Sequence, residues 1–380
     1  MTPFKKELPL FQSVATLIGT IIGAGILGVP YVFSQAGFWT GTLVLVFITF
    51  AMISLKLIFG EMSLRTYGKH QISGYVEKYL GKFWRDVTSV VLILTISGSL
   101  LAYFVGVGQV LAEVFGGVDV LWGLLFYVLA SLFLFCGIKL IKSIEFILTI
   151  VIFLIVLVIT FLSLNHLNAE NWSGFNTLML FAPYGVILFA CSGIVAVPEV
   201  REILFRKEHL FKKAIYWGAA IPSIIYFIFA LVVVGVSGPA TTEVATIGLG
   251  HFVGKKVLVI GNLFAFFTMA TSFLTIGLAL KEALNYDFKI KHVYAWLITV
   301  SSPLVIYFLG LNDFIKIISI AGALGFGVNG VVYIFAYWRA RKRGERQPEY
   351  ILPKSFAMPV SVFLVLVFIG GLIYTLWESF

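Results

Sequence analysis

Charged residues are scarce in this chain. Asp, Glu, Lys and Arg make up only 12% of its 380 residues, whereas hydrophobic residues make up 60%. A soluble domain carries roughly 25% charged and about 45–50% apolar residues, so this composition excludes an ordinary soluble fold. The charge that is present is mainly positive, with a formal net charge of +9. The positions of these basic residues decide whether they serve a nucleic acid or a membrane.

Cysteines and long polar segments are also scarce. The 2 cysteines, Cys136 and Cys191, fall in apolar stretches, where a thiol packs as a small hydrophobic group, so we expect no disulfide. No polar connection is long enough for a separate catalytic or nucleic-acid-binding domain, which needs roughly 50 residues. We therefore expect function to reside among apolar helices, with no cofactor and no metal other than a coupling cation.

Apolar runs are abundant. Eleven of them have the length of about 20 residues that an α-helix needs to cross roughly 30 Å of hydrocarbon. The first run is preceded only by Lys5 and Lys6 and lacks a small-residue cleavage site, so we expect it to remain as a helix. The predicted spans are residues 10–36, 38–64, 86–115, 119–136, 143–163, 176–200, 214–237, 257–280, 293–310, 313–338 and 356–378.

The basic residues predict the orientation of the chain. Nearly all of the 27 Lys and Arg fall in connections that lie on one side of the membrane. Cytoplasmic loops are enriched in Lys and Arg, so we expect the N-terminus in the cytoplasm and the C-terminus outside, in a cell (inner or plasma) membrane. Because the basic residues lie in the connections on one side of the membrane, we expect the chain to interact with the lipid bilayer and not with a nucleic acid.

The first apolar run carries a cluster of helix-breaking residues near its middle, GTIIGAGILGVP at 19–30. Glycine lowers the cost of unwinding a helix, and proline is tolerated in the first turn of a new one. In hydrocarbon, non-helical backbone persists only where protein, ligand or water covers its polar groups. A break here would therefore mark a binding site.

The sixth run repeats this pattern in FACSGIVAVPE at 189–199, where a glycine again precedes a proline. Interruptions at corresponding positions in two halves indicate an inverted-repeat transporter. The predicted units are residues 1–175 (helices one to five), 176–338 (helices six to ten) and 339–380 (a basic cytoplasmic loop and an eleventh helix). The alternative is close helix packing, because Gly19 and Gly23 also form a GxxxG pair.

Two such breaks offer complementary peptide dipoles to a zwitterion. A helix that begins in the membrane has free N–H groups, and a helix that ends there has free carbonyls. We expect the first helix to bind the substrate carboxylate through N–H groups and the sixth helix to bind its ammonium through carbonyls. The predicted residues for the carboxylate are Gly23, Ala24 and Gly25. The predicted residues for the ammonium are Cys191, Ser192 and Gly193.

At these residues the chain resembles the amino acid/auxin permeases and the hydroxy and aromatic amino acid permeases, within the amino acid, polyamine and organocation superfamily. GTIIGAGILGVPYVFSQAG at 19–37 resembles the first-helix signature, and GEMSLRTYG at 60–68 resembles the end of the second helix. PEV at 198–200 and TSFLTIGLAL at 271–280 resemble motifs of helices six and eight, and Tyr103 resembles a third-helix aromatic residue beside the substrate.

The resemblance implies an all-α, five-plus-five inverted-repeat fold with discontinuous helices one and six, an eleventh helix, and ion-coupled amino acid uptake. It also implies a sodium site with carbonyl and hydroxyl ligands from helices one and eight. The implied ligands are Gly19, Ile22, Thr268, Thr271 and Ser272. The alternative for the two helix-eight hydroxyls is a hydrogen bond to their own helix.

Ionisable residues inside the apolar runs are candidates for proton transfer or gating. Such residues include Glu61, Glu145, Glu199 and Lys56. Glu61 and Glu199 are the candidates, and Glu199 is preferred because it follows the break in helix six. The alternative is ion pairing at the membrane interface, since Arg65 lies four residues after Glu61 and Arg201 lies two after Glu199.

Three rival classes remain to be weighed. An intramembrane enzyme needs reactive side chains, and no His-Asp, zinc-binding or Ser-base arrangement occurs at membrane depth. A channel needs a carbonyl filter or a ring of charge, and neither occurs in the breaks. The expected function is alternating-access symport of a neutral amino acid, with aromatic or branched side chains favoured. The alternatives left open are a proton-coupled transporter of another small zwitterion and a transporter-like amino acid sensor.

Overall fold

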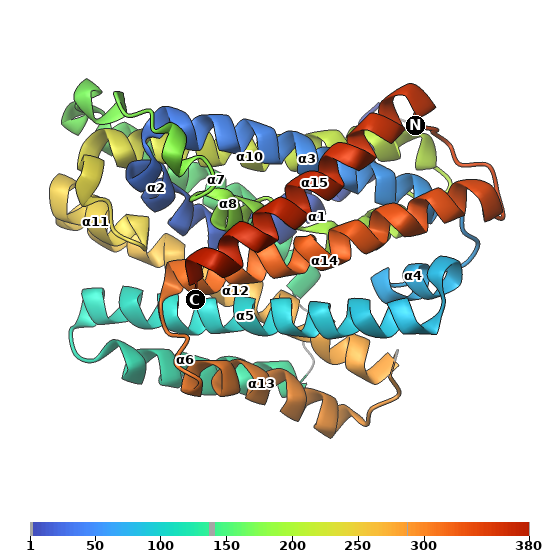
Figure 1. Cartoon of the computed structure of the whole chain (residues 1–380). Coiled ribbons are helices and arrows are strands. Elements are labelled where there is room, and N and C mark those ends of the chain that lie inside the picture. Colours follow the sequence, from blue (N-terminus) through green and yellow to red (C-terminus); the bar gives the residue numbers. More distant parts are fainter. Residues whose placement is uncertain (1–2, 137–140, 287, 380) are drawn as a thin grey trace.

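The computed structural model describes residues 3–136, 141–286 and 288–379, and the regular elements of these segments are all helices (Figure 1). The α-helices are α1 Pro3–Ile21, α2 Gly25–Ala36, α3 Phe38–Leu64, α4 Ile72–Leu80, α5 Lys82–Phe115, α6 Asp119–Cys136, α7 Ile141–Ser163, α8 Tyr184–Ala190, α9 Val197–Ile203, α10 Phe211–Ser237, α11 Ala245–Val253, α12 Lys255–Tyr286, α13 His292–Phe308, α14 Phe314–Arg343 and α15 Lys354–Ser379.

The long helices account for the predicted membrane spans. In the described part of the chain, 7 helices are long and apolar enough to cross a membrane, and the bent pair α1 and α2 makes an eighth. The remaining predicted spans correspond to α7, to α13 and to the segment that holds α8 and α9. The chain is thus a multi-pass helical membrane protein.

The first span is broken where the sequence predicts. Helix α1 ends at Ile21 and α2 begins at Gly25, and the two segments are bent by 58°. One residue after α2, Gly37 adopts a φ of 91°, a left-handed conformation that favours glycine, and the chain turns there into α3.

The sixth span is broken as well. Helix α8 ends at Ala190, and α9 begins at Val197 after a short 3₁₀ turn over Ile194–Ala196. Between them Gly193 has a φ of 86°, which a residue with a side chain rarely adopts. Both predicted breaks are therefore present, each next to a glycine.

Helix α14 lies at the centre of the packing, against α5, α8 and α15. Its contact with α8 is backbone to backbone: a Cβ added at Gly322 would lie 2.3 Å from the carbonyl oxygen of Gly185. Small residues allow such close approach between membrane helices. Figure 1 shows α15 crossing α14 obliquely, and α6 and α13 lying on the far side of α5.

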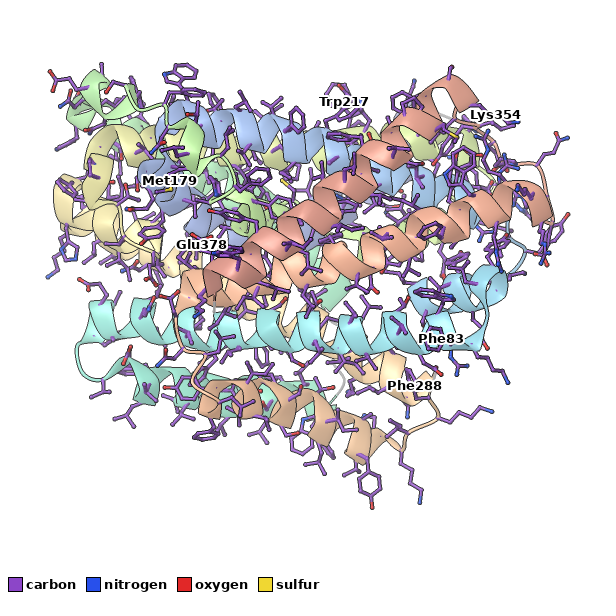
Figure 2. All side chains as sticks on the ribbon, viewed as in Figure 1. Phe83, Met179, Trp217, Phe288, Lys354 and Glu378 are labelled. Atoms are coloured by element: carbon purple, nitrogen blue, oxygen red, sulfur yellow. The ribbon has the colours of Figure 1, made fainter. Side chains whose placement is uncertain are left out.

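Large apolar side chains cover the outside of the bundle. Phe83 is 70% exposed, Trp217 51% and Met179 43%, and Figure 2 shows them pointing outward from different helices. So much exposed apolar surface is abnormal in water but expected against lipid. Lys354 and Glu378 lie near the two ends of α15, and in the same view Lys354 lies at one edge of the bundle.

One local prediction was wrong. Residues 176–183 were assigned to the sixth span, but the α-helix begins only at Tyr184, after a 3₁₀ turn over Thr177–Met179 and the proline Pro183. The helices α4 and α11 fall in predicted connections. At 9 residues each they are too short to span a bilayer, and a search for long apolar runs passes over them.

Candidate functional site

The first break brings three predicted residues together. Gly23 lies against the hydroxyls of Tyr103 on α5 and Ser272 on α12: a Cβ added at Gly23 would meet the Ser272 Oγ at 3.1 Å and the Tyr103 Oη at 3.2 Å. Tyr103 and Ser272 also hydrogen-bond to each other, and both are buried. The residue predicted beside the substrate and one predicted sodium ligand therefore share one location.

Other predicted residues hold the two breaks in contact. A Cβ on Gly25 would lie 2.5 Å from the Cα of Ala190, so the first turn of α2 packs directly on the end of α8. A Cβ on Gly193 would lie 2.5 Å from a side-chain carbon of Ile21. Gly25 and Gly193 therefore do serve close helix packing, which was the alternative to a helix break. Here the close packing occurs at the broken helices themselves.

The start of α2 presents backbone donors at the break. Gly23 and Ala24 precede α2 and Gly25 opens it, so α2 itself offers no carbonyl acceptor for their N–H groups. All three residues are buried. This is the partially positive end of a helix, a favourable place for an anionic group.

Tyr226 on α10 joins the two breaks. Its hydroxyl lies 2.8 Å from the carbonyl oxygen of Ile21, at the end of α1, and 3.0 Å from that of Ala190, at the end of α8. Tyr226 is fully buried. One hydroxyl thus serves as the donor for carbonyls at the C-terminal ends of both half-helices, which would otherwise be costly to bury.

Lys56 on α3 reaches the break in helix six. Its Nζ donates a hydrogen bond of 2.9 Å to the carbonyl oxygen of Cys191, and Lys56 is fully buried. The Cys191 thiol lies 3.9 Å from the Ser223 hydroxyl on α10. The Cys191 carbonyl, predicted to face the substrate ammonium, therefore already accepts a hydrogen bond from a protein cation.

The helix-eight hydroxyls differ in their surroundings. The Thr271 hydroxyl lies 2.8 Å from the Phe267 carbonyl and 3.2 Å from the Thr268 carbonyl of its own helix, the arrangement described by the back-bonding alternative. Ser272 turns toward Gly23 instead. On helix one, Gly19 is half-buried, and the buried Ile22 donates its N–H to the Ile18 carbonyl at 2.8 Å.

Glu61 lies in a polar cluster away from the breaks. The fully buried carboxylate accepts a 2.7 Å hydrogen bond from Arg65, and the Arg341 Nε lies 3.4 Å away. The Tyr337 hydroxyl and the Leu352 N–H donate to its other oxygen at 3.1 and 2.8 Å. Glu61 therefore ties α3 to the end of α14 and to the connection before α15.

Glu199 lies on α9 and is half-buried. Two residues on, Arg201 crosses to the segment after α3, where its guanidinium donates to the Thr66 carbonyl at 2.6 Å and the Gly68 carbonyl at 3.2 Å. It also donates to the Tyr75 hydroxyl on α4 at 2.8 Å. The α9 half of the sixth span is thus attached to the same end of the bundle as Glu61.

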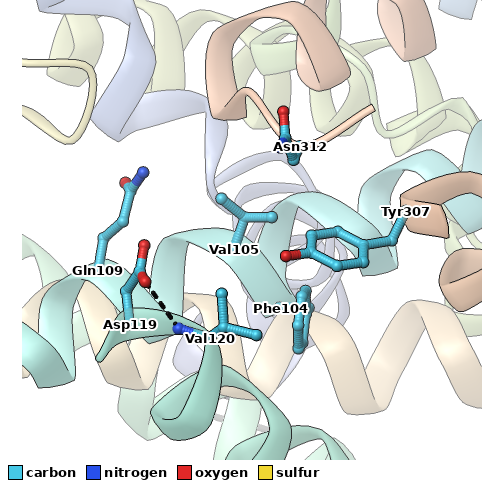
Figure 3. Close-up of a pocket in the computed structure, with 7 residues that line it drawn as sticks. All are labelled: Phe104, Val105, Gln109, Asp119, Val120, Tyr307 and Asn312. Carbon is cyan, nitrogen blue, oxygen red and sulfur yellow. Dashed lines mark hydrogen bonds between the residues drawn. The ribbon is translucent and has the colours of Figure 1, made fainter. Parts of the chain in front are cut away.

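A cavity of about 130 Å³ lies apart from the breaks, between α5, α6 and the α13–α14 connection (Figure 3). The Asp119 carboxylate at its edge accepts a 2.8 Å hydrogen bond from the Val120 N–H. It contains no predicted site residue. The lining residues are Phe104, Val105, Gln109, Asp119, Val120, Tyr307 and Asn312.

Sequence reasoning counted Lys56 among the ionisable residues inside the apolar runs but did not place it in the site, and it missed Tyr226. Lys56 had a visible signal, because it is a charge inside an apolar run. Tyr226 had none, because it is one of 16 tyrosines and only the packing of α10 against α1 brings it to the breaks.

An all-helical membrane bundle with helices one and six broken at its centre defines a class of carriers. The chain superposes on MhsT in complex with L-phenylalanine with a TM-score of 0.73 at 14% identity, covering 97% of this chain and 98% of that one. Mhp1, a nucleobase-cation-symport-1 family transporter, gives 0.61 at 14% identity, with 97% and 91% coverage. These similarities show the fold.

The pattern of the tryptophan/tyrosine permease family matches residues 6–375, and the chain belongs to that family. Glutamine transporter 2 of Aliivibrio fischeri is 24% identical over 335 residues, 83% of this chain and 85% of that protein. Tyrosine-specific transport system 1 of Haemophilus influenzae is 24% identical over 360 residues, covering 88% and 89%. The resemblance drawn from the motifs is confirmed: the chain is an amino acid permease rather than an enzyme.

Proposed function

We propose that this chain is a secondary active transporter that couples the movement of a neutral amino acid to an ion gradient by alternating access. The observation that carries the proposal is the meeting of the two helix breaks through Gly25 and Ala190 and through the Tyr226 hydroxyl. Carbonyl ends and an N–H end of half-helices converge there, which suits a molecule with one negative and one positive group.

In this proposal the substrate carboxylate binds the N–H groups of Gly23, Ala24 and Gly25. Its ammonium binds carbonyls of the second break, at Ser192 and Gly193, while the Cys191 carbonyl is shared with Lys56. Tyr103 stands beside the site, since its hydroxyl lies next to Gly23. Rearrangement at the breaks then opens the site alternately to the two sides of the membrane.

The substrate class is drawn from the relatives and from the walls of the site. Two relatives are named for glutamine and for tyrosine, which both carry uncharged side chains. The side chains next to Gly23 are the uncharged Tyr103 and Ser272, so a charged substrate side chain beside them would lack an ion-pair partner. A neutral amino acid is therefore proposed, with aromatic or branched side chains favoured.

Two coupling ions fit the proposal. Sodium would be held by oxygens of Gly19, Ile22, Thr268, Thr271 and Ser272, a set without carboxylate that suits a hard cation. A proton would need a titratable residue at the breaks. In either case we place the N-terminus in the cytoplasm and the C-terminus outside, and we divide the chain into repeats 1–175 and 176–338 with an appended segment 339–380.

Uptake by purified protein in liposomes tests the function. With an imposed ion gradient, L-tyrosine or L-glutamine should accumulate inside above the outer concentration, whereas a channel would only equilibrate it and a sensor would only bind it. Gly23→Ala, which puts a methyl group 3.1 Å from the Ser272 Oγ and 3.2 Å from the Tyr103 Oη, should reduce uptake at least tenfold.

The matched control is Gly98→Ala, whose added Cβ would meet Ala321 at 3.2 Å between α5 and α14, away from the breaks. This variant should transport like the wild type. If uptake is equal in both variants and the wild type, the proposed site is wrong. If no neutral amino acid accumulates under any gradient, the proposed function is wrong.

A further inference from the structure

The Lys56 ammonium is a charge buried inside the bundle without an acidic partner. Lys56 is fully buried on α3, and among the described residues no carboxylate forms an ion pair with it. Its hydrogen-bond acceptor is a backbone carbonyl, that of Cys191. A buried ammonium without a counter-ion is costly, and intramembrane ionisable residues mark functional sites by default.

The break in helix six offsets part of that cost. Helix α8 ends at Ala190, so the carbonyls at its last turn and at Cys191 form the partially negative end of a helix that faces the ammonium. This stabilisation depends on the shape of the break, because a straight helix would direct the Cys191 carbonyl into its own hydrogen-bond ladder. The affinity of Lys56 for its proton is therefore linked to the conformation of helix six.

The other titratable groups near α3 are engaged elsewhere or neutral. Glu61, on the same helix, is held by Arg65, Arg341 and the Tyr337 hydroxyl. The thiol of Cys191 is the titratable group that interacts with Lys56 directly. The remaining titratable side chains on helices that pack against α3 near its middle are Tyr31, Tyr184, Glu199, Arg201, Tyr226 and Tyr333.

We propose that Lys56 is the residue that carries the coupling proton. In the conformation described here the ammonium holds the Cys191 carbonyl. When helix six rearranges during transport and withdraws that carbonyl, Lys56 gives one proton to water and becomes a neutral amine. It takes up one proton from the other side when the break re-forms, so each cycle moves one proton with no other change in bonding.

This inference rests on the proposed symport and selects the proton over sodium as the coupling ion. Lys56 can bind and release a proton, which the hydroxyl residues of the proposed sodium site on α12 do not do. It also explains why the hydrogen bond from Lys56 joins residues 135 positions apart: the helix that bears the proton contacts the helix that changes shape.

The test uses purified full-length protein in sodium-free liposomes with L-tyrosine as the probe. Two fluxes are compared: accumulation driven by an acidic outside, and counterflow exchange at equal pH, which needs no net proton movement. Wild-type protein should show both. Lys56→Met should lose at least tenfold more of the gradient-driven accumulation than of the exchange, and its accumulation should have a flat dependence on outside pH.

The matched control is Lys281→Met. Lys281 on α12 is also buried, at 3% exposure, and also donates to a single backbone carbonyl, that of Leu134, but it lies away from both breaks. This variant should keep both fluxes. Lys56→Arg, whose guanidinium stays charged, should likewise lose far more of the driven flux than of the exchange.

Three results would overturn the proposal. The first is a Lys56 variant that still exchanges L-tyrosine and whose accumulation is stimulated by the pH gradient as strongly as that of the wild type. The second is loss of exchange in both variants, which would assign Lys56 a purely structural role. The third is wild-type accumulation that requires sodium and ignores the pH gradient. Absence of wild-type exchange under all conditions would instead contradict the transport function itself.

Discussion

At the scale of single residues, the site is defined by donors that satisfy carbonyls left over where helices end. The Tyr226 hydroxyl serves Ile21 and Ala190, and the Lys56 ammonium serves Cys191. Without such donors the broken backbone would have unsatisfied groups in a dry interior, at about 1–3 kcal/mol each. These side chains therefore make the broken conformation tolerable before any substrate binds.

Tyr226→Phe should weaken the junction of the two breaks. It removes the hydroxyl and leaves two carbonyls without that donor, so we expect uptake to fall at least tenfold and the thermal unfolding midpoint to drop. Tyr127→Phe is the matched control, because the Tyr127 hydroxyl donates 2.8 Å to the Val300 carbonyl on α13, away from the breaks. Equal uptake in the two variants would contradict the role given to Tyr226.

At the scale of helices, the sequence predicted the breaks well because glycine and proline act locally. Gly193 adopts its positive φ at the position where the pattern FACSGIVAVPE interrupts the sixth span. The donors could not be predicted in the same way. Tyr226 reaches the breaks only through the packing of α10 on α1, which depends on side chains far apart in the chain.

The search for long apolar runs did not predict the short elements correctly. Residues 176–183 are apolar enough to resemble membrane helix, yet Asn176 accepts a hydrogen bond from the Leu178 N–H at 3.0 Å and opens a 3₁₀ turn instead. Helix α4, ISGYVEKYL, carries charge and is short. An average of hydropathy over a long window is insensitive to such short elements.

The Glu61 cluster joins α3 to α14 and to the connection before α15, and it predicts a loss of stability when broken. Glu61→Gln leaves Arg65 and Arg341, whose side chains are 13% and 11% exposed, without their carboxylate. Removing one partner of a buried ion pair costs about 3–5 kcal/mol, so thermal unfolding in detergent should begin several degrees lower.

Glu202→Gln provides the control for that measurement. Glu202 pairs with Lys69 at 2.7 Å, but the two side chains are 44% and 77% exposed, and exposed pairs contribute about 0–1 kcal/mol. The unfolding midpoint of this variant should stay near that of the wild type. A Glu61 variant as stable as the Glu202 variant would show that the cluster does not hold these helices together.

At the scale of the whole molecule, segments from the two halves of the chain combine into one site. The first break at residues 22–24 and the second at 191–193 meet near the centre of the bundle, with α10 contacting both and α3 contacting the second. The arrangement agrees with the fold of MhsT over nearly the whole chain. In the proposed function the substrate binds to peptide dipoles that tertiary packing holds together.

An experimental structure with a bound amino acid tests this account most directly. With L-tyrosine present, the account predicts the carboxylate within hydrogen-bond distance of the N–H groups of Gly23, Ala24 and Gly25, and the ammonium near Ser192 and Gly193. Tyrosine bound elsewhere, for example in the cavity lined by Gln109 and Asn312, with both breaks unoccupied, would contradict it.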